Sequence, residues 1–204
     1  MSSLTLRYMR TGDIGQVIAI DNVSFDPPWS ARSYAYEISE SSYSHMVVLE
    51  RSGAGAAPAR WRRWFGLAAN GSESGMIVGY GGLWQIADEA HISTIATHPG
   101  WRGRGYGEIL LAGMVRRACT LGAAYVVLEV RVSNHVAQSL YYKYDFVIAG
   151  VKQRYYRNNN EDAYDMRLNL TDADIRARFE ERLVALHQRQ PFTDSYSEVA
   201  PVRR

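Results

Sequence analysis

The chain has 204 residues, of which 47% are hydrophobic and 12% aromatic, so it can bury an ordinary core and is not disordered throughout. Its 23 basic and 21 acidic side chains leave a net charge of +2, which gives no overall basic field for nucleic acid. No stretch approaches the roughly 18 apolar residues that cross a bilayer, and the N-terminus lacks the apolar run of a signal peptide. We therefore expect a cytoplasmic protein without direct nucleic-acid or membrane partners.

The single cysteine, Cys119, excludes an internal disulfide and a cysteine-based metal site. It lies in the helix that ends at Gly122, one turn before that glycine, and we expect it to be a small buried core residue. The five histidines show no paired ligand spacing, so the sequence predicts no metal.

The spacing of apolar residues predicts strands where polarity alternates residue by residue, and helices where apolar residues recur three or four positions apart. In chain order these are a strand at 4–9, helices at about 13–25 and 31–40, strands at 44–50, 76–86 and 91–97, a helix ending at Gly122, a strand at 124–130, a helix at 133–144, strands at 146–151 and 163–168, and a helix at 172–188. The final residues of the chain are expected to be frayed.

Side chains that favour helix ends agree with these boundaries. Thr11 and Asp13 can cap the first helix, and the Asp-Pro-Pro stretch at 26–28 must end it because proline breaks helices. Ser30 can cap the second helix, and either residue of the Ser-Asn pair at 133–134 can cap the helix that follows it.

Residues 51–75 differ from the rest of the chain in composition. They are rich in Gly, Ala and Ser, carry a basic-aromatic cluster at 60–65 (RWRRWF), and show no sustained period. We interpret them as an insertion between two strands. A long hairpin connection and a surface for an acidic partner both remain open, since tryptophan beside arginine is a common anchor at interfaces.

The clearest sign of chemistry is the stretch 102–107 (RGRGYG), which directly follows a strand and precedes a helix. Glycines allow a tight turn, and the unpaired N–H groups at the start of the next helix attract an anion. The stretch therefore predicts a phosphate-binding loop, although an ordinary tight turn would use similar residues. No Lys-Ser/Thr follows it, and its glycine spacing fits a dinucleotide-binding loop poorly.

The loop and its neighbours resemble the GNAT superfamily of N-acetyltransferases. The pattern Arg/Gln-x-x-Gly-x-Gly at 102–107 is similar to the family's acetyl-CoA pyrophosphate loop. Segments 95–97 (IAT), 128–134 (LEVRVSN) and 137–146 (AQSLYYKYDF) follow in the family's order around it.

Two outer segments narrow the resemblance to the branch that acetylates protein N-termini, especially the bacterial ribosomal-protein-alanine N-acetyltransferases. These are 25–30 (FDPPWS) and 154–163, which holds a Tyr-Tyr pair and a Glu-Asp-Ala sequence. The resemblance covers about 4–168, without 51–75.

The resemblance implies an α/β domain with the GNAT fold. Its mixed, mostly antiparallel sheet would be flanked by helices and splayed between the fourth and fifth strands to admit acetyl-CoA. The domain would span 1–170 with 51–75 as a loop insertion, and 171–204 would form a C-terminal helix and tail. This helix could pack on the edge of the sheet, mediate a dimer, or do neither.

The resemblance also implies which residues hold acetyl-CoA, the cosubstrate. Part of the fourth strand would contact the pantetheine arm, the glycine loop and the helix start would hold the pyrophosphate, and one asparagine would bond near the thiol. In this order the residues are Ile95, Ala96 and Thr97; Arg102, Gly103, Arg104, Gly105, Tyr106, Gly107 and Glu108; and Asn134. The two arginines could equally be ordinary exposed residues of a loop.

Two residues would carry the catalysis, in which the amine attacks the thioester directly. Glu129 matches the family's general base, acting through water, and Tyr141 matches the acid that protonates the departing thiolate. From the residues alone, Glu129 could instead pair with Arg131 on a solvated strand face, and Tyr141 could be a core residue.

Four aromatic residues, Phe25, Trp29, Tyr155 and Tyr156, would line the cleft for the substrate. Trp29 could equally be a core residue. The implied function is acetylation of the N-terminal α-amino group of a protein, expected to be a ribosomal protein with a small first residue. The alternatives are acetylation of a lysine, a polyamine or an antibiotic, and a non-catalytic CoA-binding module.

Overall fold

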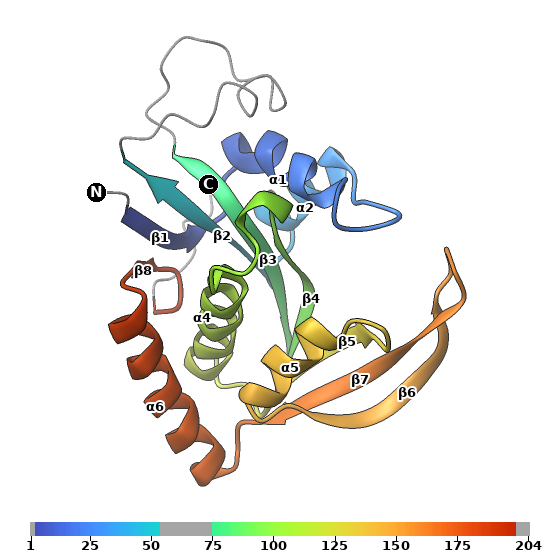
Figure 1. Cartoon of the computed structure of the whole chain (residues 1–204), viewed down its shortest axis with the longest axis vertical. Helices are drawn as coiled ribbons and strands as arrows, with labels where there is room; N and C mark the ends of the chain where they lie inside the picture. The colour runs from blue at the N-terminus through green and yellow to red at the C-terminus, as the bar shows by residue number, and fades with distance from the viewer. Residues whose placement is uncertain (1–2, 54–74, 199–204) are drawn as a thin grey trace.

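The computed structural model describes residues 3–53 and 75–198, and this part of the chain forms an eight-stranded sheet with helices on both faces (Figure 1). The basic-aromatic cluster at 60–65 lies outside the described residues. In chain order the elements are β1 (Ser3–Tyr8), the 3-10 turn η1 (Thr11–Asp13), α1 (Ile14–Asp21), α2 (Ala31–Ser39), β2 (Ser44–Ser52), β3 (Met76–Ile86), β4 (Glu89–Thr97), the 3-10 turn η2 (Pro99–Trp101), α4 (Tyr106–Thr120), β5 (Tyr125–Arg131), α5 (His135–Lys143), β6 (Val147–Tyr156), β7 (Glu161–Asn169), α6 (Ala173–Arg189) and β8 (Thr193–Ser195). Within the described residues, no helix is long and apolar enough to cross a membrane.

The sheet is mixed and mostly antiparallel, with the strand order β6-β7-β5-β4-β3-β2-β1-β8. Parallel pairing occurs between β4 and β5 and between β1 and β8. The pairing of β4 with β5 runs from Glu89 opposite Tyr125 to His91 opposite Val127 and ends there. The two strands then separate, so the predicted α/β fold and its splay between the fourth and fifth strands are confirmed.

The centre of the sheet is covered on both faces, and β2 shows why its sequence is apolar throughout. Met46 and Val48 belong to the core cluster beneath α1 and α2, whereas Val47 and Leu49 belong to the cluster beneath α4. Successive side chains of a strand point to opposite faces, so a strand buried on both faces needs an unbroken apolar run.

Two glycines of β3 let α4 lie close against the sheet. A Cβ atom at Gly79 would lie 2.8 Å from Leu110 Cδ1, and one at Gly81 would lie 2.8 Å from Met114 Sδ. A larger residue at either position would force the side chains of α4 to move from the strand.

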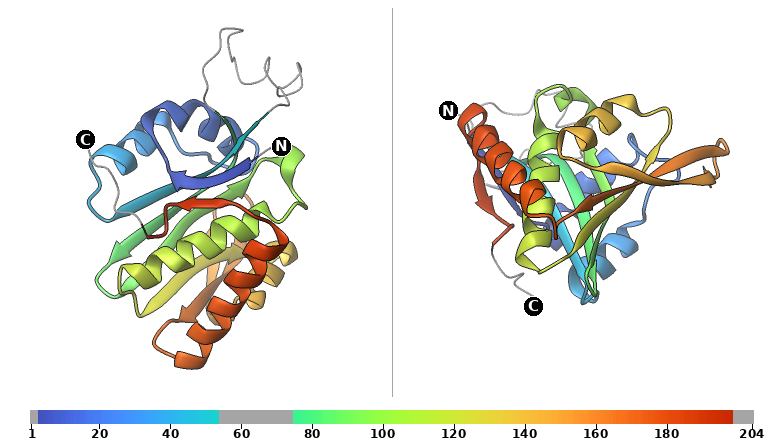
Figure 2. Two further views of the ribbon diagram at one scale, coloured as in Figure 1. Left: turned by 90° about the vertical axis from the view of Figure 1, so that its left-hand side faces the viewer. Right: turned by 90° about the horizontal axis from the view of Figure 1, so that it is seen from below.

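The C-terminal part of the chain packs on the rest of the molecule. Helix α6 runs beside α4, as Figures 1 and 2 show, and Arg116 of α4 forms an ion pair with Glu180 of α6. Phe179 and Leu186 of α6 belong to the same core cluster as α4 and β5. The helix therefore packs on another helix, while the edge of the sheet is taken by β8.

The chain is not frayed from the end of α6 to residue 198, and the last residues, 199–204, lie outside the described residues. Strand β8 pairs in parallel with β1, and the side chain of Tyr196 beside it is fully buried. The Tyr196 hydroxyl donates a hydrogen bond to the carbonyl oxygen of His45 at 3.0 Å. The sequence shows only one aromatic residue, Tyr196, in an otherwise polar stretch, and this is too little to predict a strand.

Some helix ends also differ from the sequence expectation. Helix α1 ends at Asp21, four residues earlier than expected, and Asp13 does not cap it. Ser30 does cap α2, since its hydroxyl accepts the Ser33 N–H at 3.0 Å, and Asn134 caps α5 by accepting the Ala137 N–H at 3.2 Å. The strands β6 and β7 extend further into their hairpin than predicted.

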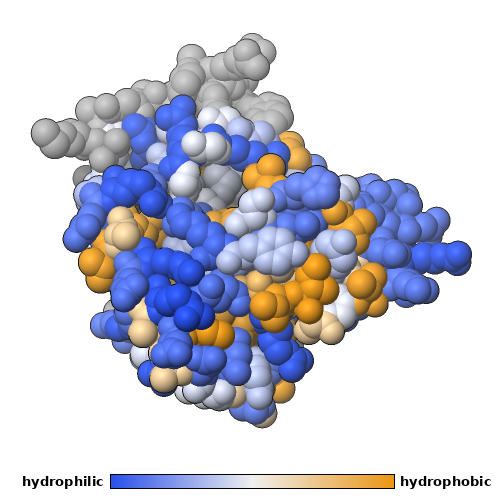
Figure 3. All heavy atoms as spheres, turned by 60° about the horizontal axis from the view of Figure 1, so that its bottom comes forward, coloured by the Kyte–Doolittle hydropathy of each residue, from blue (hydrophilic) through white to orange (hydrophobic). Residues whose placement is uncertain are grey.

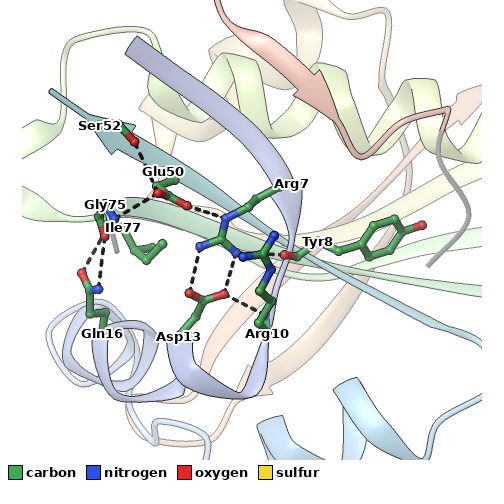
Figure 4. Close-up of polar contacts among 9 residues, drawn as sticks. All are labelled: Arg7, Tyr8, Arg10, Asp13, Gln16, Glu50, Ser52, Gly75 and Ile77. Carbon is green, nitrogen blue, oxygen red and sulfur yellow. Dashed lines mark hydrogen bonds and ion pairs between the residues drawn. The ribbon is translucent and has the colours of Figure 1, made fainter. Parts of the chain in front are cut away.

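Asp13 instead belongs to a buried polar network centred on Arg7 (Figure 4). Both terminal nitrogens of Arg7 donate to the Asp13 carboxylate, at 2.7 and 2.9 Å, and its Nε donates to Glu50. The Glu50 carboxylate also accepts the Gly75 N–H at 3.0 Å, and Gln16 accepts the Ile77 N–H at 3.0 Å. The network thus ties β1, β2, the start of β3 and the first helical turn together.

We predict that Arg7→Met lowers the free energy of unfolding by about 3 kcal/mol, because two largely buried carboxylates lose their cation. Chemical denaturation of the variant measures this loss. Arg32→Met, at an exposed position on α2, is the matched control and should have little effect. A loss below about 1 kcal/mol for Arg7→Met would mean that the network adds little to stability.

Candidate active site

Two pockets open where β4 and β5 separate, and they share one wall. The Glu129 pocket has a volume of about 350 Å³, and the glycine-loop pocket has a volume of about 580 Å³. The residues that line both are Ser24, Phe25, Ile95, Asn134 and Tyr141. Molecules bound in the two pockets would therefore meet beside the Tyr141 side chain.

The glycine loop enters α4 through left-handed backbone. Gly103 has φ +74° and Gly105 has φ +77°, where a side chain is strained. The hydrogen bonds of the helix begin with the Glu108 N–H, which donates to the Gly105 carbonyl at 3.1 Å. Helix α4 itself therefore does not use the N–H groups of Tyr106 and Gly107, and a bound anion could accept them.

The two arginines of the loop lie against the protein. Arg102 donates from Nε to the Thr97 carbonyl oxygen at 3.1 Å, and the Arg104 guanidinium lies 4.8 Å from the ring centre of Trp101. Arg104 is the one residue of the predicted cofactor set that does not line the glycine-loop pocket. The loop thus offers mainly backbone N–H groups to a ligand.

Glu108 keeps two cations beside the loop. Its carboxylate accepts hydrogen bonds from Lys143 at 2.6 Å, the Tyr144 hydroxyl at 3.0 Å and Arg189 at 2.8 Å. Burial alone would raise the pKa of this carboxyl, but these hydrogen bonds outweigh it and lower the pKa. Glu108 therefore stays ionised and holds α5 and the end of α6 next to the loop.

Glu129 is held between two basic side chains. His91 Nε2 donates to Glu129 Oε2 at 2.8 Å, and Lys152 Nζ forms an ion pair with Glu129 Oε1. Burial raises the pKa of the Glu129 carboxyl, yet the hydrogen bonds from His91 and Lys152 lower it to about 2. Arg131 pairs with Glu161 at 2.9 Å, so the alternative Glu129–Arg131 pair is not formed.

Tyr141 reaches the junction of the two pockets from α5. Its side chain is 5% exposed, and burial raises the pKa of its phenol above the ordinary value. The phenol is therefore protonated at neutral pH and can donate a proton or a hydrogen bond. Asn134 lies nearby, but its Oδ1 already caps α5, which leaves its amide NH₂ group for a bound molecule.

All four aromatic residues predicted for the substrate cleft line the Glu129 pocket. The rings of Tyr155 and Tyr156 are 5.2 Å apart and nearly perpendicular, and the Arg131 guanidinium lies 3.8 Å from the Tyr156 ring centre. Trp29 packs against the second core cluster and also lines the pocket.

Asp21 fixes the loop that carries Phe25 and Trp29. Its buried carboxylate accepts the Trp29 backbone N–H at 2.6 Å and hydrogen bonds from the Tyr34 and Tyr80 hydroxyls. Asn158 of the β6–β7 turn donates to Asp26, which also lines the pocket, at 3.3 Å. The hairpin and the loop after α1 therefore meet at the edge of the pocket.

On the face shown in Figure 3, apolar residues gather near the middle and hydrophilic residues surround them. Exposed apolar side chains of α5 and β6 include Val136, Val147 and Val151. Val136 is 85% exposed and lines the glycine-loop pocket, so part of that pocket's rim is apolar.

Three residues at the site were missed from the sequence: His91, Lys152 and Asp21. His91 and Lys152 reach Glu129 across neighbouring strands, and their roles depend on a register that the sequence does not reveal. Asp21 stands at the end of a helix and looks like a surface residue in the sequence. The Asp-Pro-Pro stretch at 26–28 was the one sequence feature that indicated a fixed conformation for the loop after α1.

Comparison with known proteins identifies relatives. The model of the Acetyltransferase (GNAT) family matches residues 16–146. A Bacillus subtilis (strain 168) protein named putative [ribosomal protein bS18]-alanine N-acetyltransferase is 34% identical over 167 residues, covering 82% of this chain and 96% of that protein. The N-alpha-acetyltransferase RimI of Mycobacterium tuberculosis is 36% identical over 102 residues, covering 48% of this chain and 63% of that protein.

Solved structures with the same fold have varied substrates. The ribosomal-protein-S18-alanine N-acetyltransferase from Escherichia coli has a TM-score of 0.65 at 23% identity, covering 85% of this chain and 96% of that one. A spermidine/spermine N-acetyltransferase from Vibrio cholerae has a TM-score of 0.60 at 22% identity, covering 82% and 92%. These similarities show the fold and do not identify the acceptor amine.

We predict that Gly105→Asp weakens binding of acetyl-CoA at least tenfold, because it strains the loop and puts a negative charge at the anion site. A Cβ atom there would also lie 2.7 Å from Gln190 Oε1. Calorimetric titration measures the affinity.

The matched control is Gly122→Asp. Gly122 has φ +79°, so the backbone strain is similar, but it follows the far end of α4 and does not line the glycine-loop pocket. Equal loss of affinity in both variants would show that strain alone is responsible, and would place the pyrophosphate elsewhere.

Proposed function

The chain belongs to the GNAT family of acetyltransferases and is an acyltransferase, and from this premise we propose that it acetylates the N-terminal α-amino group of a protein. The acetyl donor is acetyl-CoA, and the expected acceptor is a ribosomal protein with a small first residue. The names of the relatives, ribosomal protein bS18-alanine N-acetyltransferases, support this acceptor.

The glycine-loop pocket fits acetyl-CoA. Two glycines with positive φ and the free helix start suit a pyrophosphate, and the cations on Glu108 add positive charge nearby. Beyond His91 the edge of β4 no longer pairs with β5, so the backbone groups of 95–97 can bond an extended arm containing amides. Acetyl-CoA brings the activated thioester; the chain positions it.

The observation that carries the proposal is the meeting of the two pockets at Tyr141. Glu129 lies in one pocket, and the glycine loop lies in the other. An amine held near Glu129 would approach a thioester that enters along β4 from the opposite side. Such an arrangement brings acceptor and donor together without a covalent intermediate on the protein.

The protonation states of Glu129 and Tyr141 support the two proposed catalytic roles. Glu129 is ionised at neutral pH and can accept the proton that leaves the amine, through a water molecule. Tyr141 is protonated and can give a proton to the departing thiolate. A carboxyl with a pKa of about 2 is a weak base, so it works best with an amine that loses its proton easily.

The Glu129 pocket suits the end of an unfolded chain. Its aromatic walls, Phe25, Trp29, Tyr155 and Tyr156, can pack on a first side chain, and about 350 Å³ is room for one or two small residues. The contact between Asn158 and Asp26 brings the β6–β7 hairpin to the loop beside the pocket, which favours a chain end over the middle of a folded surface.

Two matched peptides test the function. One has a free N-terminal alanine and no lysine, and the other has a blocked N-terminus and one internal lysine. We predict CoA thiol release with the first peptide and acetyl mass on its α-amine. Turnover of the lysine peptide alone would assign the activity to lysine side chains, and turnover of neither would contradict the proposal.

We predict that Glu129→Gln lowers the rate on the alanine peptide roughly 10²- to 10⁴-fold, since the amide cannot accept the proton, while CoA affinity is kept. Glu180→Gln is the control, because Glu180 is an exposed residue of α6 that lines neither pocket. Stopped-flow or steady-state thiol release measures the rates. An unchanged rate in Glu129→Gln would remove Glu129 from catalysis.

A further inference from the structure

The carboxylate of Glu129 already has a cation of the protein beside it. Lys152 on β6 reaches across β7 to Glu129 on β5, and its ammonium also lies 3.8 Å from the Asp165 carboxylate. His91 takes the other oxygen of Glu129. Each oxygen of the proposed base therefore has a hydrogen-bond donor from the protein, and its charge is compensated before any substrate arrives.

The groups around this lysine come from four strands. They are Glu129 on β5, Asp165 on β7, the Tyr155 ring on β6 at 5.7 Å and, through Glu129, His91 on β4. The hydrogen bond with Glu129 raises the pKa of Lys152, and the same contact lowers the pKa of Glu129. Both groups stay charged from acidic to alkaline pH, so the pair does not titrate where the enzyme works.

We propose that Lys152 is a specificity residue, which makes the site favour amines that are neutral over amines that arrive as ammonium ions. This inference rests on the proposed function and explains how that function would select α-amines over lysine side chains. A protonated amine that approaches Glu129 finds the carboxylate already paired with the Lys152 ammonium and gains little attraction from it. A neutral amine loses nothing by this pairing.

The expected preference for α-amines over lysine side chains can be calculated from the pKa values of the two amines. An α-amino group has a pKa of about 7.8 and a lysine side chain about 10.4, so at pH 7.5 their neutral fractions differ roughly 300-fold. A site that binds only the neutral amine therefore prefers α-amines to lysine side chains, without any contact with the rest of the substrate. An uncompensated Glu129 would instead attract ammonium ions and, with a higher pKa, would be a stronger base for them.

An exposed surface ion pair is the competing explanation, because the Lys152 side chain is 42% exposed. Such a pair adds little to stability, and its loss would not change which amine reacts. The pH profile and the ratio between amines therefore separate the two explanations.

The experiment uses the full chain with the alanine and lysine peptides described above. The ratio of their kcat/KM values is measured from pH 6.5 to 9.5 for the wild type, Lys152→Met and Lys152→Arg, and unfolding temperatures show that each variant is folded. We expect the wild type to prefer the α-amine by roughly 10²-fold at pH 7.5, with a rate that levels off near the pKa of that amine. Lys152→Met should lower the ratio about tenfold, and Lys152→Arg should restore it because the cation is kept.

Two results would overturn the inference while leaving the proposed function intact. One is an unchanged ratio in Lys152→Met, and the other is an equal fall of the ratio in Lys152→Met and Lys152→Arg, which would indicate a structural effect. Failure of the wild type to acetylate either peptide would overturn the proposed function and the inference with it.

Discussion

The short pairing between β4 and β5 is the constraint on which both pockets depend. The parallel pairing ends at His91 and Val127. Beyond these residues the two strands diverge, and they no longer pair with each other. On one side of the gap lies the glycine loop, and on the other lies Glu129. Tyr141 enters the gap from α5, so donor and acceptor sites follow from one break in the sheet.

A buried carboxylate, Asp21, and a half-buried one, Glu108, hold the walls of this gap in place. Asp21 fixes the loop of Phe25 and Trp29, and Glu108 joins α4, α5 and α6 beside the glycine loop. Carboxylates that are wholly or partly removed from water are costly unless their hydrogen bonds are satisfied, and here each accepts several. The site is therefore built on rigid contacts before any ligand binds.

The sequence predicted the elements whose signals are local. Ser30, Asn134 and Gly122 mark helix ends that the structure also shows, and the glycine loop stands where its pattern placed it. Strand β8 was not predicted because three residues are too few to show an alternating pattern. Its pairing with β1 also joins segments near opposite ends of the chain. The partners of Glu129, His91 and Lys152, were not predicted for a related reason. Cross-strand contacts depend on the register and on which strands are neighbours.

Amide hydrogen exchange with and without CoA tests the central claim, that the break between β4 and β5 receives the cofactor. The account predicts slower exchange for the backbone amides of 95–97 and for the glycine loop at 103–107, with α1 and β1 unchanged. Protection confined to the β6–β7 hairpin, or none in these two segments while CoA is bound, would contradict it.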